Sequence, residues 1–109
     1  MQIVVSARHA EITDEMKAYA EEKTSKLLKF YDKIQEIEVV LDRDSAKHCV
    51  EVIVNAEHRN TFVANSTGED FFEATDLVVD KLERQLTRHK DKHRNRKHLP
   101  RREDKVPEA

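Results

Sequence analysis

The sequence has few of the residues that cross-link or interrupt small folds. It contains one cysteine, one glycine, two prolines and no tryptophan among its 109 residues. With Cys49 alone no internal disulfide can form, and such cysteine usage is typical of a reducing compartment. No apolar run is long enough to cross a membrane, and the first residues lack the pattern of a secretory signal peptide. We therefore expect a cytoplasmic protein without a membrane segment.

Sequence motifs of enzymes are missing as well. The chain has no phosphate-binding glycine loop, no HExxH pair and no Ser/His/Asp set, and no pair of carboxylates stands in a context that indicates catalysis. We expect neither an enzyme nor a bound cofactor. The function is then to be sought in binding rather than in chemistry.

Charge is strongly uneven along the chain, although the formal net charge is only −2. Residues 81–102 hold ten basic and two acidic side chains, whereas residues 1–80 hold nine basic and seventeen acidic ones. A cluster of Lys and Arg attracts phosphate backbones whatever the average charge of the protein. A basic helical end also suits the helix dipole and solubility, so a merely solvated surface is the plain alternative. The size of the local excess favours nucleic acid.

Hydrophobic periodicity predicts six elements along the chain. Thr13 is expected to cap the first helix, and Ser66 with Glu69 has the spacing of a capping box for the second. The predicted elements are strand 2–8, helix 14–31, strand 35–42, strand 48–58, strand 61–65 and helix 68–93. Pro100 and Pro107 discourage helix further on, so we expect one domain over residues 1–94 and a flexible tail over 95–109, basic and then acidic.

This order of elements predicts an α+β fold of the form β-α-β-β-β-α. We expect a four-stranded, mostly antiparallel sheet with both helices packed on one face. The expected core stripe of the second helix is Phe71, Thr75, Val78, Leu82 and Leu86.

The opposite face of the sheet is expected to be acidic, through Glu36, Glu38, Asp42, Glu51 and Glu57. Helical spacing also predicts one basic stripe on each helix: Lys26, Lys29 and Lys33 on the first, and Lys81, Arg84, Arg88 and Lys92 on the second. Side by side, the two stripes would form a paired basic surface with a groove between them.

Two stretches carry a resemblance to a known family. The opening IVVSARHAEITDEMKAYAEEKTSKLLKFYDKI and the later STGEDFFEATDLVVDKLERQLTRHKDK are similar to the short ribosome hibernation promoting factors and the related stationary-phase translation inhibitors, also known as the sigma-54 modulation proteins. The resemblance spans about residues 1–93, and DKLERQLTRHKDK is its most specific part.

The resemblance implies a fold similar in layout to double-stranded-RNA-binding domains and a role in ribosome hibernation under stress or in stationary phase. Members of this family lodge in the mRNA and tRNA channel of the small ribosomal subunit and contact its ribosomal RNA. Carried over by position, the implied RNA-binding residues are Lys23, Lys26, Lys29, Lys81, Arg84, Arg88, Lys90 and Lys92. The implied protein is monomeric off the ribosome, and a separate ribosome-pairing factor is a possible partner.

Several alternatives stay open at this point. Within the family, short promoting forms assist ribosome pairing while inhibitors with extended tails oppose it. A general module for structured RNA would show a similar basic surface. A metal site is the third alternative, because His89 and His93 lie four residues apart and would share one helical face. Since no third ligand is evident, we expect these histidines to be solvated or to face RNA, with no metal bound.

Overall fold

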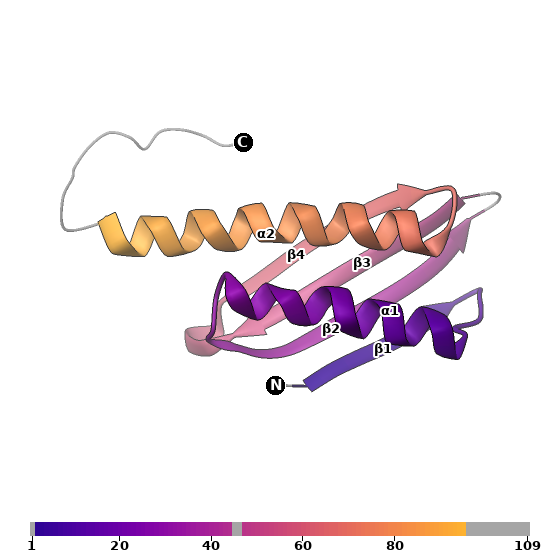
Figure 1. Ribbon diagram of the computed structural model, residues 1–109, viewed down its shortest axis with the longest axis horizontal. Coiled ribbons are helices and arrows are strands. Elements are labelled where there is room, and N and C mark those ends of the chain that lie inside the picture. The colour runs from indigo at the N-terminus through magenta and orange to yellow at the C-terminus, as the bar shows by residue number, and fades with distance from the viewer. Residues whose placement is uncertain (1, 45–46, 96–109) are drawn as a thin grey trace.

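The computed structural model describes residues 2–44 and 47–95 of the chain, which form one sheet and two main helices (Figure 1). The elements are β1 (Gln2–Arg8), α1 (Asp14–Ser25), η1 (Lys26–Lys29), β2 (Ile34–Asp44), β3 (Lys47–Ala56), η2 (Glu57–Arg59), β4 (Thr61–Gly68) and α2 (Phe71–Asn95). The predicted order of strands and helices is confirmed. The tail predicted for 95–109 falls almost entirely outside the described residues, so the domain boundary at residue 94 stays a prediction.

The sheet has the strand order β1-β2-β3-β4, with β1 parallel to β2 and the other two pairs antiparallel. Both helices cover one face of the sheet, α1 nearer β1 and α2 over β4 and β3 (Figure 1). They run in the same direction, so their C-terminal ends lie at the same end of the molecule (Figure 1). The predicted α+β architecture is therefore confirmed. No described helix is long and apolar enough to span a bilayer.

The hydrophobic core lies between the sheet and the two helices. All five residues of the predicted α2 stripe are buried, and so are the alternate valines of β3, Val50, Val52 and Val54. Ala20 of α1 and Leu27 of η1 are also fully buried. Burial of an aliphatic side chain stabilises a fold by about 1.5–3 kcal/mol, so this layer fixes the helices on the sheet.

The first helix begins as predicted but ends earlier. Thr13 Oγ1 accepts a hydrogen bond from the Met16 amide at 3.1 Å, which confirms the predicted cap. The α-helix stops at Ser25 instead of Tyr31 and continues as the 3₁₀ turn η1. Thr24 donates to the carbonyl of Ala20 at 2.7 Å, and Ser25 donates to that of Glu22 at 2.8 Å. Hydroxyl groups bonded back to the preceding turn compete with the regular helix, which explains the early change.

The second helix begins later than predicted, because a different residue caps it. β4 continues to Gly68, beyond the predicted end at Asn65, and α2 starts at Phe71. Asp70 accepts a hydrogen bond from the Glu73 amide at 2.9 Å, and Glu73 accepts one from the Glu69 amide at 2.8 Å. The capping pattern therefore uses Asp70 and Glu73, and the predicted box of Ser66 and Glu69 is wrong. Ser66 is buried in β4 instead.

Gly68 fits the tight junction between β4 and α2. A Cβ atom at this position would lie 2.9 Å from the Ala74 amide nitrogen, closer than such contacts occur in proteins. The single glycine of the chain is thus required for close packing of the strand end against the first turn of α2.

Side chains of α2 protect the free edge of the sheet at β4. Lys81 donates to the Asn65 carbonyl at 2.7 Å, and Gln85 donates to the Val63 carbonyl at 3.0 Å. These are alternate carbonyl groups of a strand that has only one neighbour in the sheet. Because unpaired strand edges attract other strands, occupying these acceptors disfavours aggregation.

Candidate nucleic-acid interface

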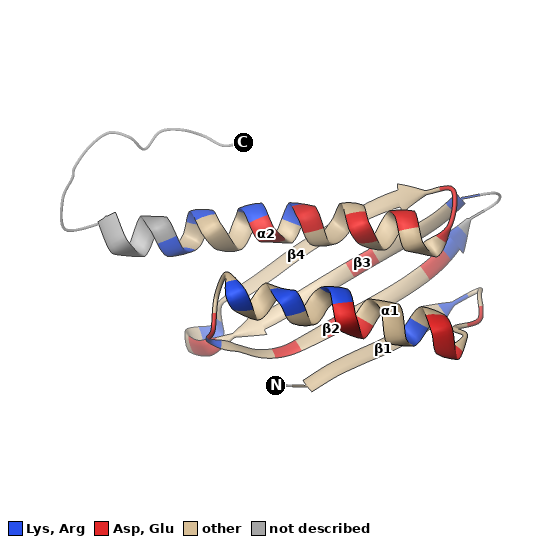
Figure 2. Ribbon diagram, in the orientation of Figure 1, with Lys and Arg blue, Asp and Glu red and all other residues tan. Residues whose placement is uncertain are grey.

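Charge is sorted along the two helices. Acidic residues lie toward the N-terminal ends of both helices and basic residues toward their C-terminal ends (Figure 2). In α1 the first turn contains Asp14 and Glu15, and Lys23 lies in the last turn. This order complements the helix dipoles, and because the helices run in the same direction it gathers cations at one end. The basic surface is thus an end of the molecule rather than a whole face.

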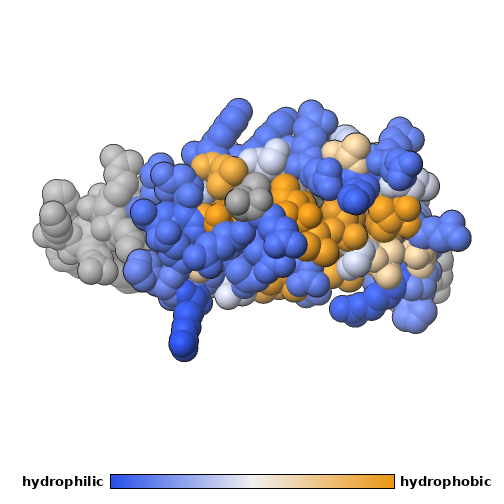
Figure 3. Space-filling view, turned by 90° about the horizontal axis from the view of Figure 1, so that it is seen from below, coloured by the Kyte–Doolittle hydropathy of each residue, from blue (hydrophilic) through white to orange (hydrophobic). Residues whose placement is uncertain are grey.

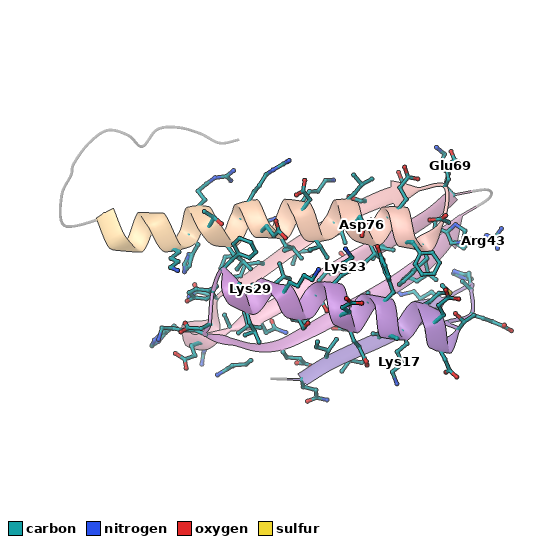
Figure 4. All side chains as sticks on the ribbon, viewed as in Figure 1. Lys17, Lys23, Lys29, Arg43, Glu69 and Asp76 are labelled. Carbon is teal, nitrogen blue, oxygen red and sulfur yellow. The ribbon has the colours of Figure 1, made fainter. Side chains whose placement is uncertain are left out.

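Lys23 lies in the contact between the two helices. Its ammonium group is 3.9 Å from Asp76 of α2 and 5.5 Å from the centre of the Tyr19 ring, and its side chain is 31% exposed. Figure 4 shows Lys23 and Asp76 pointing toward each other across the gap between α1 and α2. Tyr19 donates to the same carboxylate at 2.7 Å. Lys23 is therefore partly occupied by a contact that holds the helices together.

The hydrogen bond between Tyr19 and Asp76 also changes the acidity of the phenol. It raises the pKa of Tyr19 from 10.0 to about 12, with further contributions from burial and from nearby carboxylates. A phenolate beside Asp76 would lose the hydrogen bond and face a like charge. Tyr19 therefore stays neutral across the physiological pH range.

Lys29 and Lys90 are brought together from distant parts of the sequence. Both line a cavity of about 790 Å³ at the end of the molecule where the helices terminate. Lys33, which follows η1, lines the same cavity. Lys26 and Lys29 are both exposed, and in a 3₁₀ turn residues three apart eclipse one another, so the two project on one side of η1.

Arg84 and Arg88 line a second, shallower hollow on α2. Phe30, which follows η1, contributes to this hollow, as do the acidic residues Asp80 and Glu83. Arg84 is 69% exposed and pairs with Asp80 at 3.0 Å, one helical turn away. Exposed ion pairs of this kind contribute about 0.3–0.5 kcal/mol, so Arg84 can exchange Asp80 for another anion. This hollow is the structural counterpart of the predicted groove, with mixed charge.

Lys81 lies on the other flank of α2. Its bond to Asn65 places the ammonium group beside β4, away from α1, so the predicted α2 stripe does not face one common groove. Lys92 belongs to α2, but its side chain is not among those described. The structure thus brings together Lys29 with Lys90 and Arg84 with Arg88, and separates Lys81 from both pairs.

The outer face of the sheet is less uniformly acidic than predicted. Strand register sets Glu38 beside Ile53, and Val40 beside Glu51. Val63 of β4 is 45% exposed. Seen from the β1 edge, hydrophilic residues cover the end of the molecule where the helices terminate, and apolar surface lies nearer the middle (Figure 3). The outer face of the sheet therefore combines acidic with apolar residues.

His89 is partly buried and packs against aromatic side chains from two other parts of the chain. Its ring packs edge to face against Tyr31 and Phe62, with centroid distances of 5.2 and 5.1 Å. Among the described residues no group of three or more His, Cys, Asp or Glu side chains is placed to hold a metal ion. The side chain of His93 lies outside the described set. The His89 ring therefore belongs to an aromatic cluster at the edge of the core, and contact of its remaining surface with RNA stays a prediction.

Fold and charge together define the class of this protein, a small α+β protein in which basic residues of both helices gather at one end. Residues 3–94 match the family described as Sigma 54 modulation protein / S30EA ribosomal protein, and the chain belongs to this family. It is 36% identical over 92 residues to a ribosome hibernation promoting factor of Azotobacter vinelandii, covering 84% of this chain and 85% of that one. The factor of that name from Escherichia coli K12 is 33% identical over 92 residues, covering 84% and 96%. The family suggested by the sequence is confirmed.

Two solved structures have a similar fold. The N-terminal domain of Protein Y from Thermus thermophilus superimposes with a TM-score of 0.73 at 30% identity, covering 82% of this chain and 99% of that one. A ribosomal subunit interface protein from Coxiella burnetii gives a TM-score of 0.78 at 24% identity, with coverage of 84% and 99%, and supports the fold alone. The layout similar to double-stranded-RNA-binding domains stays a prediction.

Proposed function

We propose that this protein is a ribosome hibernation factor that binds the small ribosomal subunit and blocks translation without catalysing a reaction. The curated relatives are named ribosome hibernation promoting factors, and this chain matches them over most of their length. A similar solved domain belongs to Protein Y. The observation that carries the proposal is the convergence of cations from both helices at one end of the molecule (Figure 2). The proposed site of action is the cytoplasm, where ribosomes translate.

The RNA contact is proposed to use the basic end. Lys26, Lys29, Arg84, Arg88 and Lys90 are exposed there and form its central contacts. Lys23 and Lys92 lie beside them along the chain, and Lys81 is assigned a secondary role because the Asn65 carbonyl already accepts from it. Lys and Arg contacts of this kind bind phosphate groups and follow the shape of RNA, with little reading of base sequence. Occupation of the mRNA and tRNA channel then blocks translation by steric exclusion.

Cosedimentation with purified small subunits tests this proposal. We expect the wild-type protein to sediment with small subunits and with whole ribosomes, and to reduce translation in a purified system. Free duplex RNA bound as tightly as small subunits would instead indicate a general RNA-binding module. Addition of a separate ribosome-pairing factor distinguishes promotion of ribosome pairing from opposition to it, through the appearance or loss of paired ribosomes.

A further inference from the structure

The cavity of about 790 Å³ at the basic end has the composition of a nucleotide site. Its walls come from four separate parts of the chain: η1 with Leu28 and Lys29, the segment 31–33, the turn between β3 and β4, and Lys90 of α2. Small-molecule sites in proteins have volumes of about 300–1,000 Å³ and combine an apolar wall with a few convergent polar groups. The size and lining of this cavity fit that description.

The cationic side of the cavity is available to a phosphate group. Lys29, Lys33 and Lys90 all contribute to the lining, against one carboxylate, Asp32. Toward the side chains that the structure describes, those of residues 2–43 and 47–90, none of the three ammonium groups makes an ion pair or a hydrogen bond. Cations gathered without a partner repel one another, and an anion relieves that repulsion. The lining is therefore net positive and attracts the phosphate group of a nucleotide.

The apolar side of the cavity is rigid and suits a base. Leu28 and Tyr31 form this wall. The Tyr31 ring is held by edge-to-face contacts with Phe62 at 6.1 Å and with His89 at 5.2 Å. A wall fixed in this way accepts a flat aromatic ring without ordering further side chains, which favours binding.

Asn60 supplies a hydrogen-bond acceptor on the same cavity. Its amide nitrogen donates to the Glu57 carbonyl at 3.1 Å, and because that carbonyl only accepts, the orientation of the amide is fixed. The Asn60 Oδ1 atom is left without a hydrogen-bond partner among the described residues. It can accept a hydrogen bond from a base that carries an amino group.

The turn that carries Asn60 is strained. His58 and Arg59 have φ values of 63° and 62°, and the Asn60 amide donates to the Glu57 carbonyl at 3.3 Å, the pattern of a type I′ hairpin turn. Residues other than Gly, Asn and Asp rarely adopt this conformation, at a cost of about 1–2 kcal/mol each. Strained residues of this kind cluster at ligand sites, and here the turn holds both His58 and Asn60 at the cavity.

We propose that this cavity binds one unpaired nucleotide of a single-stranded RNA, with its phosphate on Lys29, Lys33 and Lys90 and its amino-bearing base between Tyr31 and Asn60. The inference deepens the proposed function by assigning one contact that reads a base, whereas the remaining basic surface reads only phosphate and shape. Lys33 and Asn60 belong to no other contact of the proposed interface. They can therefore be changed separately from Arg84 and Arg88.

Titration of the full chain followed by amide chemical shifts tests the proposal. The probes are adenosine 5′-monophosphate, adenosine, inorganic phosphate and a single-stranded RNA of four adenosines. We expect the monophosphate to shift the amides of residues 29–33 and 57–60, and to bind about tenfold tighter than either adenosine or phosphate, since it makes both sets of contacts. Tighter binding of the tetranucleotide than of the monophosphate identifies an RNA strand as the source of the ligand. Equal or weaker binding of the tetranucleotide would overturn the assignment to an RNA strand and indicate a free nucleotide as the ligand.

Matched variants complete the test. Lys33→Glu and Asn60→Ala should each weaken binding of the monophosphate by about tenfold or more, whereas Lys17→Glu should not. Lys17 is an exposed lysine of α1 that points away from α2 (Figure 4). Lys17→Glu therefore makes the same change of charge as Lys33→Glu, at a position outside the cavity. The proposal is overturned if the monophosphate shifts no amides around the cavity, if phosphate alone binds as tightly, or if Lys33→Glu has no effect. These measurements use no ribosome. A negative result would therefore overturn the cavity proposal without contradicting the proposed binding of Arg84 and Arg88 to the small subunit.

Discussion

Tyr19 of α1 and Asp76 of α2 are joined by a hydrogen bond of 2.7 Å, which connects the two helices above the sheet. Lys23 approaches the same carboxylate, so one acidic residue of α2 holds two residues of α1. The relative position of the helices determines how their basic ends meet. This contact therefore supports the candidate interface although it makes no proposed contact with RNA.

Replacing Tyr19 with Phe should lower the free energy of unfolding at pH 7 by about 1 kcal/mol, the typical net contribution of such a hydrogen bond. In the folded protein the pKa of Tyr19 is raised from 10.0 to about 12, so the protonated phenol is the favoured form. Its contribution is complete below pH 10 and is lost as the pH rises from 10 through 12. Urea unfolding measures the free energy of unfolding at pH 8 and at pH 11. The wild type should lose stability between these two pH values, and the variant should lose less. Equal alkaline losses in both proteins would contradict the assignment.

The cap of α2 gives a second prediction. Asp70→Ala should destabilise the protein by about 1 kcal/mol, because the Glu73 amide loses its acceptor. Ser66→Ala is the matched control, since Ser66 Oγ is buried and has no hydrogen-bond partner among the described residues. That change should be neutral or slightly stabilising. Denaturant midpoints that rank the two variants in the opposite order would show that Ser66 is the cap after all.

The strained turn between β3 and β4 predicts a stabilising substitution. Arg59→Gly should raise the free energy of unfolding by about 0.5–1 kcal/mol, because glycine adopts a φ of 62° without the steric conflict of a side chain. Thr61→Gly, in the adjoining strand, should destabilise by a similar amount. Thermal unfolding of the two variants measures the difference. A lower melting temperature for Arg59→Gly would mean that the arginine side chain makes a stabilising contact in the fold.

Lys81 should behave differently from the arginines of α2. Lys81→Gln removes an ammonium group bonded to the β4 edge, so it should lower stability by about 1 kcal/mol and change small-subunit affinity less than twofold. Arg84→Gln should show the reverse, with weaker binding and nearly unchanged stability, because its ion pair with Asp80 is exposed. Unfolding and cosedimentation of both variants are compared. Equal losses of affinity would restore Lys81 to the central contact.

Much of the fold follows from hydrophobic periodicity. The stripe of α2 is buried as predicted, and the alternating valines of β3 are buried opposite it, since one face of each element must be removed from water. Element ends were predicted less well, because they depend on single hydrogen bonds. The hydroxyl of Thr24 and the carboxylate of Asp70 determined these ends, and more than one candidate cap lay within a few residues.

The candidate site was only partly predictable. Helical spacing put Lys81, Arg84 and Arg88 in one stripe, but spacing alone could not show that Lys81 bonds to the neighbouring strand β4 while Arg84 pairs with Asp80. The cavity at Lys33 and Asn60 was missed because its lining comes from segments that are distant in sequence. The four-residue spacing of His89 and His93 suggested a shared ligand, whereas the contacts of His89 with Tyr31 and Phe62 are visible only in three dimensions.

The most direct test of the account is the salt dependence of binding to the small ribosomal subunit. Affinity of the wild type should fall steeply as salt rises, because phosphate contacts release counterions. The slope of log affinity against log salt concentration should be smaller by about 2 for the double variant Arg84→Glu, Arg88→Glu. Lys17→Glu with Arg43→Glu makes the same change of charge at positions away from the basic end (Figure 4) and should leave the slope unchanged. An affinity of the wild type that is flat from low to high salt, or equal slopes for the two double variants, would contradict binding of RNA through the basic end.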